Sequence, residues 1–219
     1  MNSNYAVIAT GVAVGLLVWT CRPKLDDSSR GPTPLRLRIF RMASIASAFG
    51  QYEVETGGTF SEEMNTRPPV SWRVALLPFV DHAREYREYD IKVPWNQQKQ
   101  LAKRVNWFAP IIHTNPSDSV LTSVVAIVDR ENGGEITAPE QQKRQRDNPA
   151  DKSRHIVAVD LGLTDIEWME PRDFSLVQLR QWCASRTTNR VVVLFSDTTV
   201  LNMTGAELQK VLSSAEKAL

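Results

Sequence analysis

Residues 5–20 carry no charge, and this segment constrains the chain more than any other part of the sequence. As an α-helix, its sixteen residues would be about 24 Å long, slightly shorter than the roughly 30 Å hydrocarbon core of a bilayer. Flanking residues lengthen the helix, and Arg22 and Lys24 can reach the head groups with their long side chains. We therefore predict a single-pass, uncleaved membrane anchor over residues 1–21.

Two other interpretations of this segment stay open, a cleaved signal peptide and a buried core helix. A signal peptide normally has basic residues before its apolar run and a small-x-small cleavage site after it. The sequence has neither feature around residues 5–20. The positive charges of Arg22 and Lys24 follow the segment, so the positive-inside rule alone would leave the rest of the chain in the cytoplasm.

A linker and one globular domain are expected to follow the anchor. Residues 22–34 contain three prolines, one glycine and two serines, which prevent a continuous helix from leaving the membrane. The chain of 219 residues is 42% hydrophobic and 23% charged, which excludes general disorder. Its net charge of +1 argues against a nucleic-acid partner, because nucleic-acid binders usually carry a basic excess. We therefore place one domain over residues 35–219.

Hydrophobic spacing predicts four helices in this domain. Between Leu35 and Phe49, apolar residues recur every three or four positions, as on one face of an amphipathic helix that ends before Gly57. Thr204 and Glu207 have the spacing of a capping box and predict the start of the last helix. The four expected helices cover residues 35–53, 71–78, 97–108 and 205–218.

Runs of β-branched residues predict a sheet. The segment TSVVAIV at residues 122–128 has the composition of a buried strand, as do residues 155–161 and 191–195. Residues 199–203 are expected to form a hairpin with the last of these strands across residues 196–198. Because irregular loops separate the strands and the helices gather toward the N-terminal half, we predict an α+β domain. We expect an antiparallel sheet with flanking helices.

The histidines and cysteines do not predict a catalytic or metal site. His82, His113 and His155 lack the spacing of metal ligands, so we expect structural roles for them. The two cysteines, Cys21 and Cys183, are too few for a disulfide framework or a four-cysteine zinc site. We expect Cys183 to be a buried free thiol on a helix.

Carboxylates form three local clusters, for which a glycosidase or a calcium site is the alternative to solvated loop charges. Catalytic carboxylates must converge across a cleft, and a calcium loop needs alternating Asp or Asn ligands around a glycine. The clusters are Glu62 with Glu63, Asp129 with Glu131, and Asp165 with Glu167 and Glu170. The chain also lacks a G-x-S-x-G elbow, a G-x-G-x-x-G loop and a Walker loop. We therefore expect no enzyme activity, no cofactor and no metal.

Aromatic side chains are dense in residues 72–108. They include Trp72, Tyr86, Tyr89, Trp95, Trp107 and Phe108. Such a cluster either builds a core from short irregular segments or lines a groove for a ligand. We favour the core and expect Trp72, Trp95 and Trp168 to determine the fold. The alternative function is an extracytoplasmic glycan- or peptide-binding module that uses the aromatic cluster from Trp72 to Phe108.

Four blocks of sequence resemble one bacterial protein family in their order and spacing. They are PVSWRVALLPF at residues 69–79, YREYDIKVPWN at 86–96, IVAVD with IEWMEPRD between 156 and 173, and VLFSD at 193–197. These blocks are similar to the signature segments of the prepilin-like family catalogued as domain of unknown function 1559.

The resemblance implies a pilin-like or pseudopilin-like architecture. In such proteins an N-terminal membrane helix carries an α+β domain outside the cytoplasmic membrane, in the periplasm or at the cell exterior. This location conflicts with the orientation that the flanking charges predict. The family has no established activity, cofactor or catalytic residues. The resemblance therefore implies a non-enzymatic structural or interaction protein, linked to a type II secretion-like or surface assembly. Its expected partners are the cytoplasmic membrane and other proteins of the cell envelope.

The chain departs from the family pattern at its N-terminus and near its C-terminus. Family members usually begin with a glycine followed by Phe-Thr-Leu-Ile-Glu, and this chain lacks that string, so we expect no cleavage by a prepilin peptidase. Thr187 stands where the family has a histidine, and Thr198 follows Asp197 where the family has a glycine. Because threonine disfavours a positive φ angle, we expect a different turn at Thr198.

Overall fold

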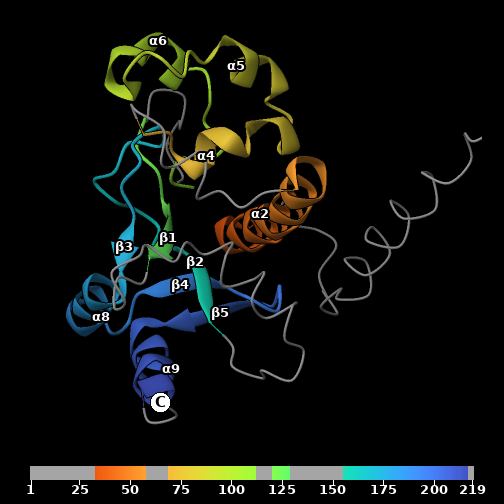
Figure 1. The fold of residues 1–219 in the computed structure, drawn as a ribbon. Coiled ribbons are helices and arrows are strands. Elements are labelled where there is room, and N and C mark those ends of the chain that lie inside the picture. Colours follow the sequence, from red (N-terminus) through yellow and green to blue (C-terminus); the bar gives the residue numbers. More distant parts are fainter. Residues whose placement is uncertain (1–32, 58–68, 112–119, 129–154, 217–219) are drawn as a thin grey trace, which may run out of the picture. The chain divides into compact units, whose positions relative to one another are not determined.

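The computed structural model describes residues 33–57, 69–111, 120–128 and 155–216 (Figure 1). From Pro34 onward the chain forms one compact unit. The predicted anchor over residues 1–21 lies outside the described residues. Among the helices of the described part, none combines the length and the apolar character that a bilayer crossing requires.

Helix α2 (Pro34–Thr56) has 23 residues and confirms the amphipathic helix predicted at residues 35–53, with one residue added at its start and three at its end. Its inner face carries apolar side chains such as Met42, Ile45 and Phe49, which lie in the core. Gly57 follows the helix with a φ of 64°, and its N–H donates to the Glu53 carbonyl at 3.0 Å. This left-handed conformation is the usual end of a helix and favours glycine there.

The sheet contains five strands in the order β3-β1-β2-β4-β5. The strands are β1 (Val124–Val128), β2 (Ile156–Asp160), β3 (Phe174–Ser175), β4 (Arg190–Phe195) and β5 (Val200–Thr204). The pairs β1–β2, β2–β4 and β4–β5 are antiparallel, but β3 runs parallel to β1. The sheet is therefore mixed, and the prediction of a purely antiparallel sheet was wrong. Strand β3 has only two residues, too few to produce a periodic pattern in the sequence.

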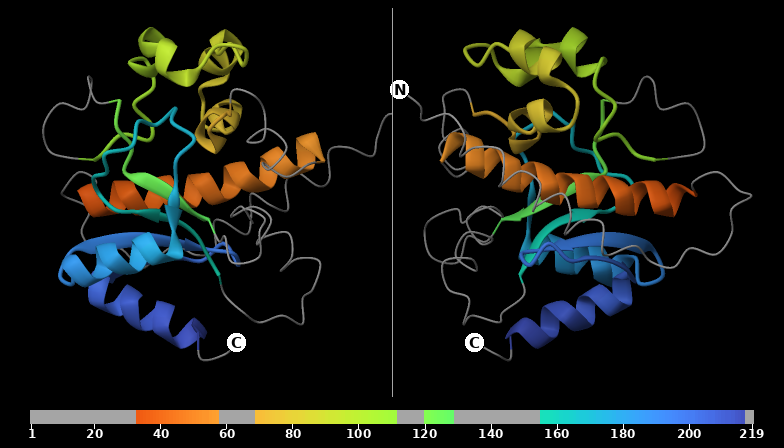
Figure 2. Two further views of the ribbon diagram at one scale, coloured as in Figure 1. Left: turned by 60° about the vertical axis from the view of Figure 1, so that its left-hand side comes forward. Right: turned by 90° about the vertical axis from the view of Figure 1, so that its right-hand side faces the viewer.

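Helices cover both faces of this sheet, as Figure 2 shows. Helix α2 lies on one face, and α8 (Leu176–Ser185) and α9 (Gly205–Glu216) pack on the other. Alternate residues of β4 pack on opposite faces of the sheet. Val192 packs on the α2 side, while Val191 and Val193 pack on the α8 and α9 side. Such two-sided burial explains why β4 is a continuous apolar run.

Capping boxes begin both helices on the second face. The Thr204 N–H donates to Glu207 Oε2 at 2.7 Å and the Glu207 N–H to Thr204 Oγ1 at 3.2 Å, which confirms the predicted start of α9. In α8, Ser175 and Gln178 exchange the same pair of bonds at 2.8 and 3.2 Å. The sequence predicted Cys183 on a helix but did not predict where that helix begins and ends. The capping box of Ser175 and Gln178 marks its start.

Short helices replace the two helices predicted between residues 71 and 108. They are α4 (Trp72–Ala75), the 3-10 turn η1 (Leu77–Phe79), α5 (Ala83–Glu88), the 3-10 turn η2 (Trp95–Gln97) and α6 (Lys99–Ala102). The predicted helix at 71–78 is split because Pro78 sits in the first turn of η1, where a missing N–H is tolerated. The helix predicted at 97–108 is only α6, because Val105 and Phe108 reach the core from turns.

Candidate functional site

A buried ion pair between Arg73 and Asp173 joins two distant blocks of the sequence. Arg73 Nη2 lies 2.5 Å from Asp173 Oδ1, and the two side chains are 0% and 2% exposed. The Ala126 N–H donates to the same oxygen at 2.8 Å, and Trp72 Nε1 donates to Oδ2 at 2.9 Å. Both oxygens of the carboxylate are therefore occupied by donors from the chain itself.

The remaining donors of Arg73 also have partners within the chain. Its Nε donates to the Val124 carbonyl at 3.0 Å, and its Nη1 reaches Ser71 Oγ at 3.2 Å and the Glu170 carbonyl at 3.3 Å. Burial lowers the pKa of Arg73 and raises that of Asp173, while their mutual attraction opposes both changes. The pair ties α4 to β1 and to the segment that precedes β3.

A second buried charge cluster fixes α2 to the end of β2. Arg41 Nη2 lies 2.5 Å from Asp160 Oδ2, and Arg38 Nη2 donates to the Asp160 carbonyl at 2.6 Å. Arg38 Nε lies 3.1 Å from Asp160 Oδ1 as an ion pair, although it is not aligned for a hydrogen bond. The Gly162 N–H donates to Oδ1 at 2.9 Å, and Arg41 also donates to Ser123 Oγ at 2.6 Å. As in Asp173, both carboxylate oxygens of Asp160 have partners within the chain.

The aromatic cluster forms part of the core. Phe108 contacts Trp72 edge-on at a ring separation of 5.9 Å and stacks on Trp168 at 6.1 Å. Trp168 Nε1 donates to the Ala102 carbonyl at 2.8 Å. Trp72 and Trp168 are at most 2% exposed, which confirms them as core residues, and Trp95 packs against the same core while partly buried.

The alternative of an aromatic binding groove therefore needs correction. Trp72, Tyr89 and Phe108 are buried and cannot line a surface groove, because apolar packing already covers their rings. Tyr86 is exposed, but the most buried members of the cluster are withdrawn from any ligand. The expectation that these rings pack in a core is the one that the structure supports.

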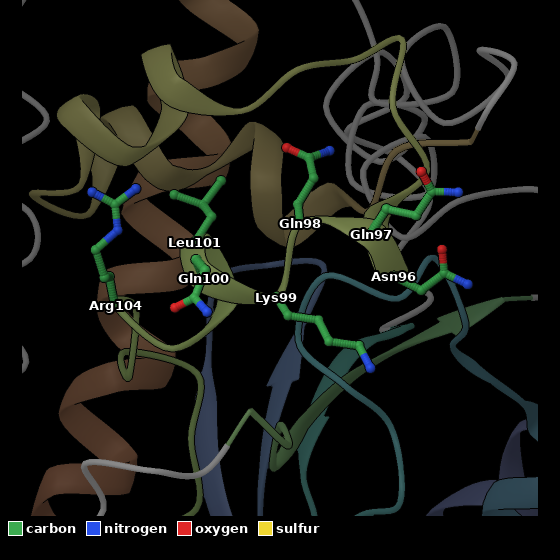
Figure 3. A pocket seen from close by; sticks show the side chains of 7 residues that line it. All are labelled: Asn96, Gln97, Gln98, Lys99, Gln100, Leu101 and Arg104. Atoms are coloured by element: carbon green, nitrogen blue, oxygen red, sulfur yellow. The ribbon is translucent and has the colours of Figure 1, made fainter.

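A shallow, open hollow of about 630 Å³ lies over η2 and α6 (Figure 3). It is lined by Asn96, Gln97, Gln98, Lys99, Gln100, Leu101 and Arg104. In Figure 3 these side chains spread along one segment instead of converging on a point. Gln98 Nε2 donates to the Asp90 and Val93 carbonyls at 2.9 Å each, and Arg104 pairs with Glu88. The hollow offers amide groups to a ligand but has no buried polar group directed into it.

Two of the three histidines lie in the described part of the chain, one in contact with a neighbouring side chain and the other bonded through its main chain. His82 Nδ1 lies 3.4 Å from Glu85 Oε2 at the start of α5, and the His155 main chain bonds to Ser196 beside β2. His113 lies outside the described residues. Over the described ranges, no three His, Cys, Asp or Glu side chains gather in a way that suits a metal ion.

Among the other predicted candidates, two carboxylates share one arginine and the thiol is buried elsewhere. Asp165 and Glu170 both pair with Arg172 at the surface, at 3.1 and 2.7 Å, which agrees with solvated loop charges. Cys183 is a buried free thiol, as expected, and burial raises its pKa. Cys21, Glu62, Glu63, Asp129 and Glu131 lie outside the described residues.

The buried charges were missed from the sequence, although a signal for them exists. Arg73 stands inside the apolar run SWRVALLPF, and Asp160 stands inside the apolar run HIVAVDL, just before its last residue. A charged residue is almost never fully buried without a partner, so a charge inside an apolar run predicts an internal ion pair. The sequence does not say which opposite charge completes each pair.

One of the comparisons with known proteins finds a match, to a family of unknown function. The family model described as protein of unknown function (DUF1559) matches residues 41–167, more than half of the chain. No curated protein and no solved structure matches the chain significantly. The matched stretch includes Arg41 and Asp160, which join α2 to β2, and Arg73, which joins α4 to β1. The chain belongs to the DUF1559 family, a prepilin-like bacterial family of unknown function.

Proposed function

We propose that this protein is a non-enzymatic, membrane-anchored, pseudopilin-like structural or interaction protein. The observation that carries the proposal is the position of α2. This helix begins thirteen residues after the uncharged segment 5–20 and lies against a sheet that helices cover on both faces. A membrane helix followed by an α+β head is the arrangement that the resemblance implies.

The internal use of the buried charges supports a non-enzymatic role. Asp160 and Asp173, the two buried carboxylates of the described residues, accept from donors of the chain on both oxygens. A catalytic acid or base needs a free position toward a substrate. We therefore assign both residues to the fold and none to chemistry.

The proposed location is the outer side of the cytoplasmic membrane, with the head facing the periplasm or the exterior. The proposed partners are the lipid bilayer and proteins of an envelope assembly linked to secretion. This location rests on the family, because the charges that flank residues 5–20 favour the opposite orientation.

Carbonate extraction and intact mass test the anchor. We expect the full-length chain in the membrane pellet, with a mass that includes residues 1–20. A soluble chain that lacks those residues would reject the anchor. A reporter fused after Leu219 tests the orientation: activity of an exported phosphatase supports the proposal, and activity of a cytoplasmic reporter contradicts it.

A further inference from the structure

Exposed apolar side chains lie on the first turns of α2. Phe40 is 72% exposed and Leu37 is 39% exposed, while Met42 and Ile45 of the same helix are fully buried. Among the described residues Phe40 is the most exposed aromatic side chain. Single exposed apolar residues are normal in proteins, but Leu37 and Phe40 are neighbours on one face of α2, and contiguous exposed apolar surface marks interaction sites.

A third apolar side chain lies at the same end of the domain. Leu163 is 61% exposed and belongs to the turn that follows β2. The neighbouring Gly162 packs beside Arg38, because a Cβ atom built on this glycine would lie 3.8 Å from Arg38 Nη2. The first turns of α2 and the turn after β2 therefore meet through Arg38 and Gly162, and both bear an exposed apolar residue.

The length of the chain before α2 limits how far this end of the domain can lie from a membrane. Residues 21–33 separate the segment 5–20 from α2. A flexible chain of thirteen residues has a root-mean-square span of about 20 Å. If segment 5–20 spans a bilayer, the first turns of α2 are tethered close to the lipid surface, where apolar side chains enter the boundary between head groups and acyl chains.

We infer that Leu37 and Phe40, one helical turn apart on α2, form a lipid-contacting patch by which the head rests on the bilayer that anchors it, with Leu163 at the same end of the domain. This inference rests on the proposed function, since it requires the anchor. It also gives α2 a direction: its N-terminal end lies at the membrane, and Val54 lies fourteen positions further, about 21 Å along the helix. Val54 is 81% exposed, so an exposed apolar residue away from the lipid is available for comparison.

Spin-label depth measurements on the full-length chain test the patch. Cys21→Ser and Cys183→Ala remove the native thiols, and a nitroxide is then attached to Phe40→Cys or, as the matched control, to Val54→Cys. Each protein is reconstituted into vesicles of phosphatidylethanolamine and phosphatidylglycerol and recovered by flotation. We expect the ratio of collisions with oxygen to collisions with a water-soluble nickel chelate to be several-fold higher at position 40 than at position 54.

The possible outcomes separate the patch from the anchor. Flotation with equal, aqueous accessibility at both positions overturns the patch and leaves the anchor standing. Dipolar broadening at position 40 that grows with the fraction of labelled protein assigns Phe40 to a second copy of the chain, and this also overturns lipid contact. Failure of every variant and of the unsubstituted chain to float rejects the anchor, and the patch with it.

Discussion

Thr198 holds the β4–β5 hairpin in a backbone conformation that favours glycine. Its φ is 65°, and its N–H donates to the Phe195 carbonyl at 2.9 Å. The replacement of a family glycine was expected to change this turn, but the left-handed conformation is present with threonine in place. A β-branched residue in this region is strained.

Replacing Thr198 with glycine should therefore stabilise the domain. We expect Thr198→Gly to raise the free energy of unfolding by about 1 kcal/mol, since relief of strain outweighs the added freedom of the unfolded chain. Urea denaturation measures the change. Thr199→Gly is the control, because Thr199 has no positive φ and gains nothing from glycine. Equal or lower stability of Thr198→Gly would contradict the strain.

Gly205 is required for a different reason, the close approach of two backbone segments. A Cβ atom at this position would lie 2.3 Å from the Arg186 carbonyl oxygen, and the Gly205 N–H donates to the Asn189 carbonyl at 3.0 Å. We expect Gly205→Ala to lower the free energy of unfolding by about 1–3 kcal/mol, because the turn before β4 must move.

Gly50 provides the matched control in the same denaturation experiment. It lies within α2, and nothing within 4 Å would meet an added Cβ atom. Gly50→Ala should raise the free energy of unfolding by about 0.5–1 kcal/mol, since alanine loses less entropy in a helix. If Gly205→Ala were as well tolerated as Gly50→Ala, the close approach would be disproved.

At the scale of elements, the ion pair of Arg73 and Asp173 connects α4, β1 and β3. Removing one partner leaves the other charge buried and unpaired. We expect Asp173→Ala to lower the free energy of unfolding by about 3–5 kcal/mol. Arg172→Ala removes ion pairs in which Arg172 is 46% exposed and a hydrogen bond to the Asp165 carbonyl, and it should cost about 1 kcal/mol or less. Thermal or urea unfolding that shows similar losses for both variants would argue against a structural role for the buried pair.

The sequence predicted those elements that have a strong period or a cap of their own. Helix α2 has a long amphipathic face, β4 is a buried β-branched run, and α9 begins with a capping box. Strand β3 was not predicted, because its pairing with β1 depends on Asp173, whose carboxylate accepts from the Ala126 N–H. Such a contact between distant residues leaves no periodic trace in the sequence.

The segment between residues 71 and 108 was predicted least well. Its apolar residues have helical spacing, yet only short turns form, because large rings such as Trp72 and Phe108 must converge on one point. Packing therefore overrides local propensity here. Of the candidate residues, the buried state of Cys183 and the surface positions of Asp165 and Glu170 were predicted, whereas the partners of the buried arginines were not.

At the scale of the whole molecule, Asp160 makes α2 and the sheet one cooperative structure. Asp160→Ala leaves Arg38 and Arg41 buried without a counter-charge, and we expect a loss of about 3–5 kcal/mol. Because α2 supplies much of the core on its face of the sheet, it should not unfold separately. Tryptophan fluorescence and far-ultraviolet circular dichroism should therefore give coincident transitions in both proteins. An earlier loss of helical signal in Asp160→Ala would show that α2 can detach.

The separation of Arg41 and Asp160 in the chain, 119 residues, also matters for how the protein is made. Ribosomes add roughly 5–20 residues per second, so α2 emerges about 6 to 24 s before the strand that neutralises its arginines. During that interval the nascent chain has no completed core. Strand β4, which adds Val192 and Leu194 to the core on the α2 side of the sheet, follows later still, so that core closes only when most of the chain has been made.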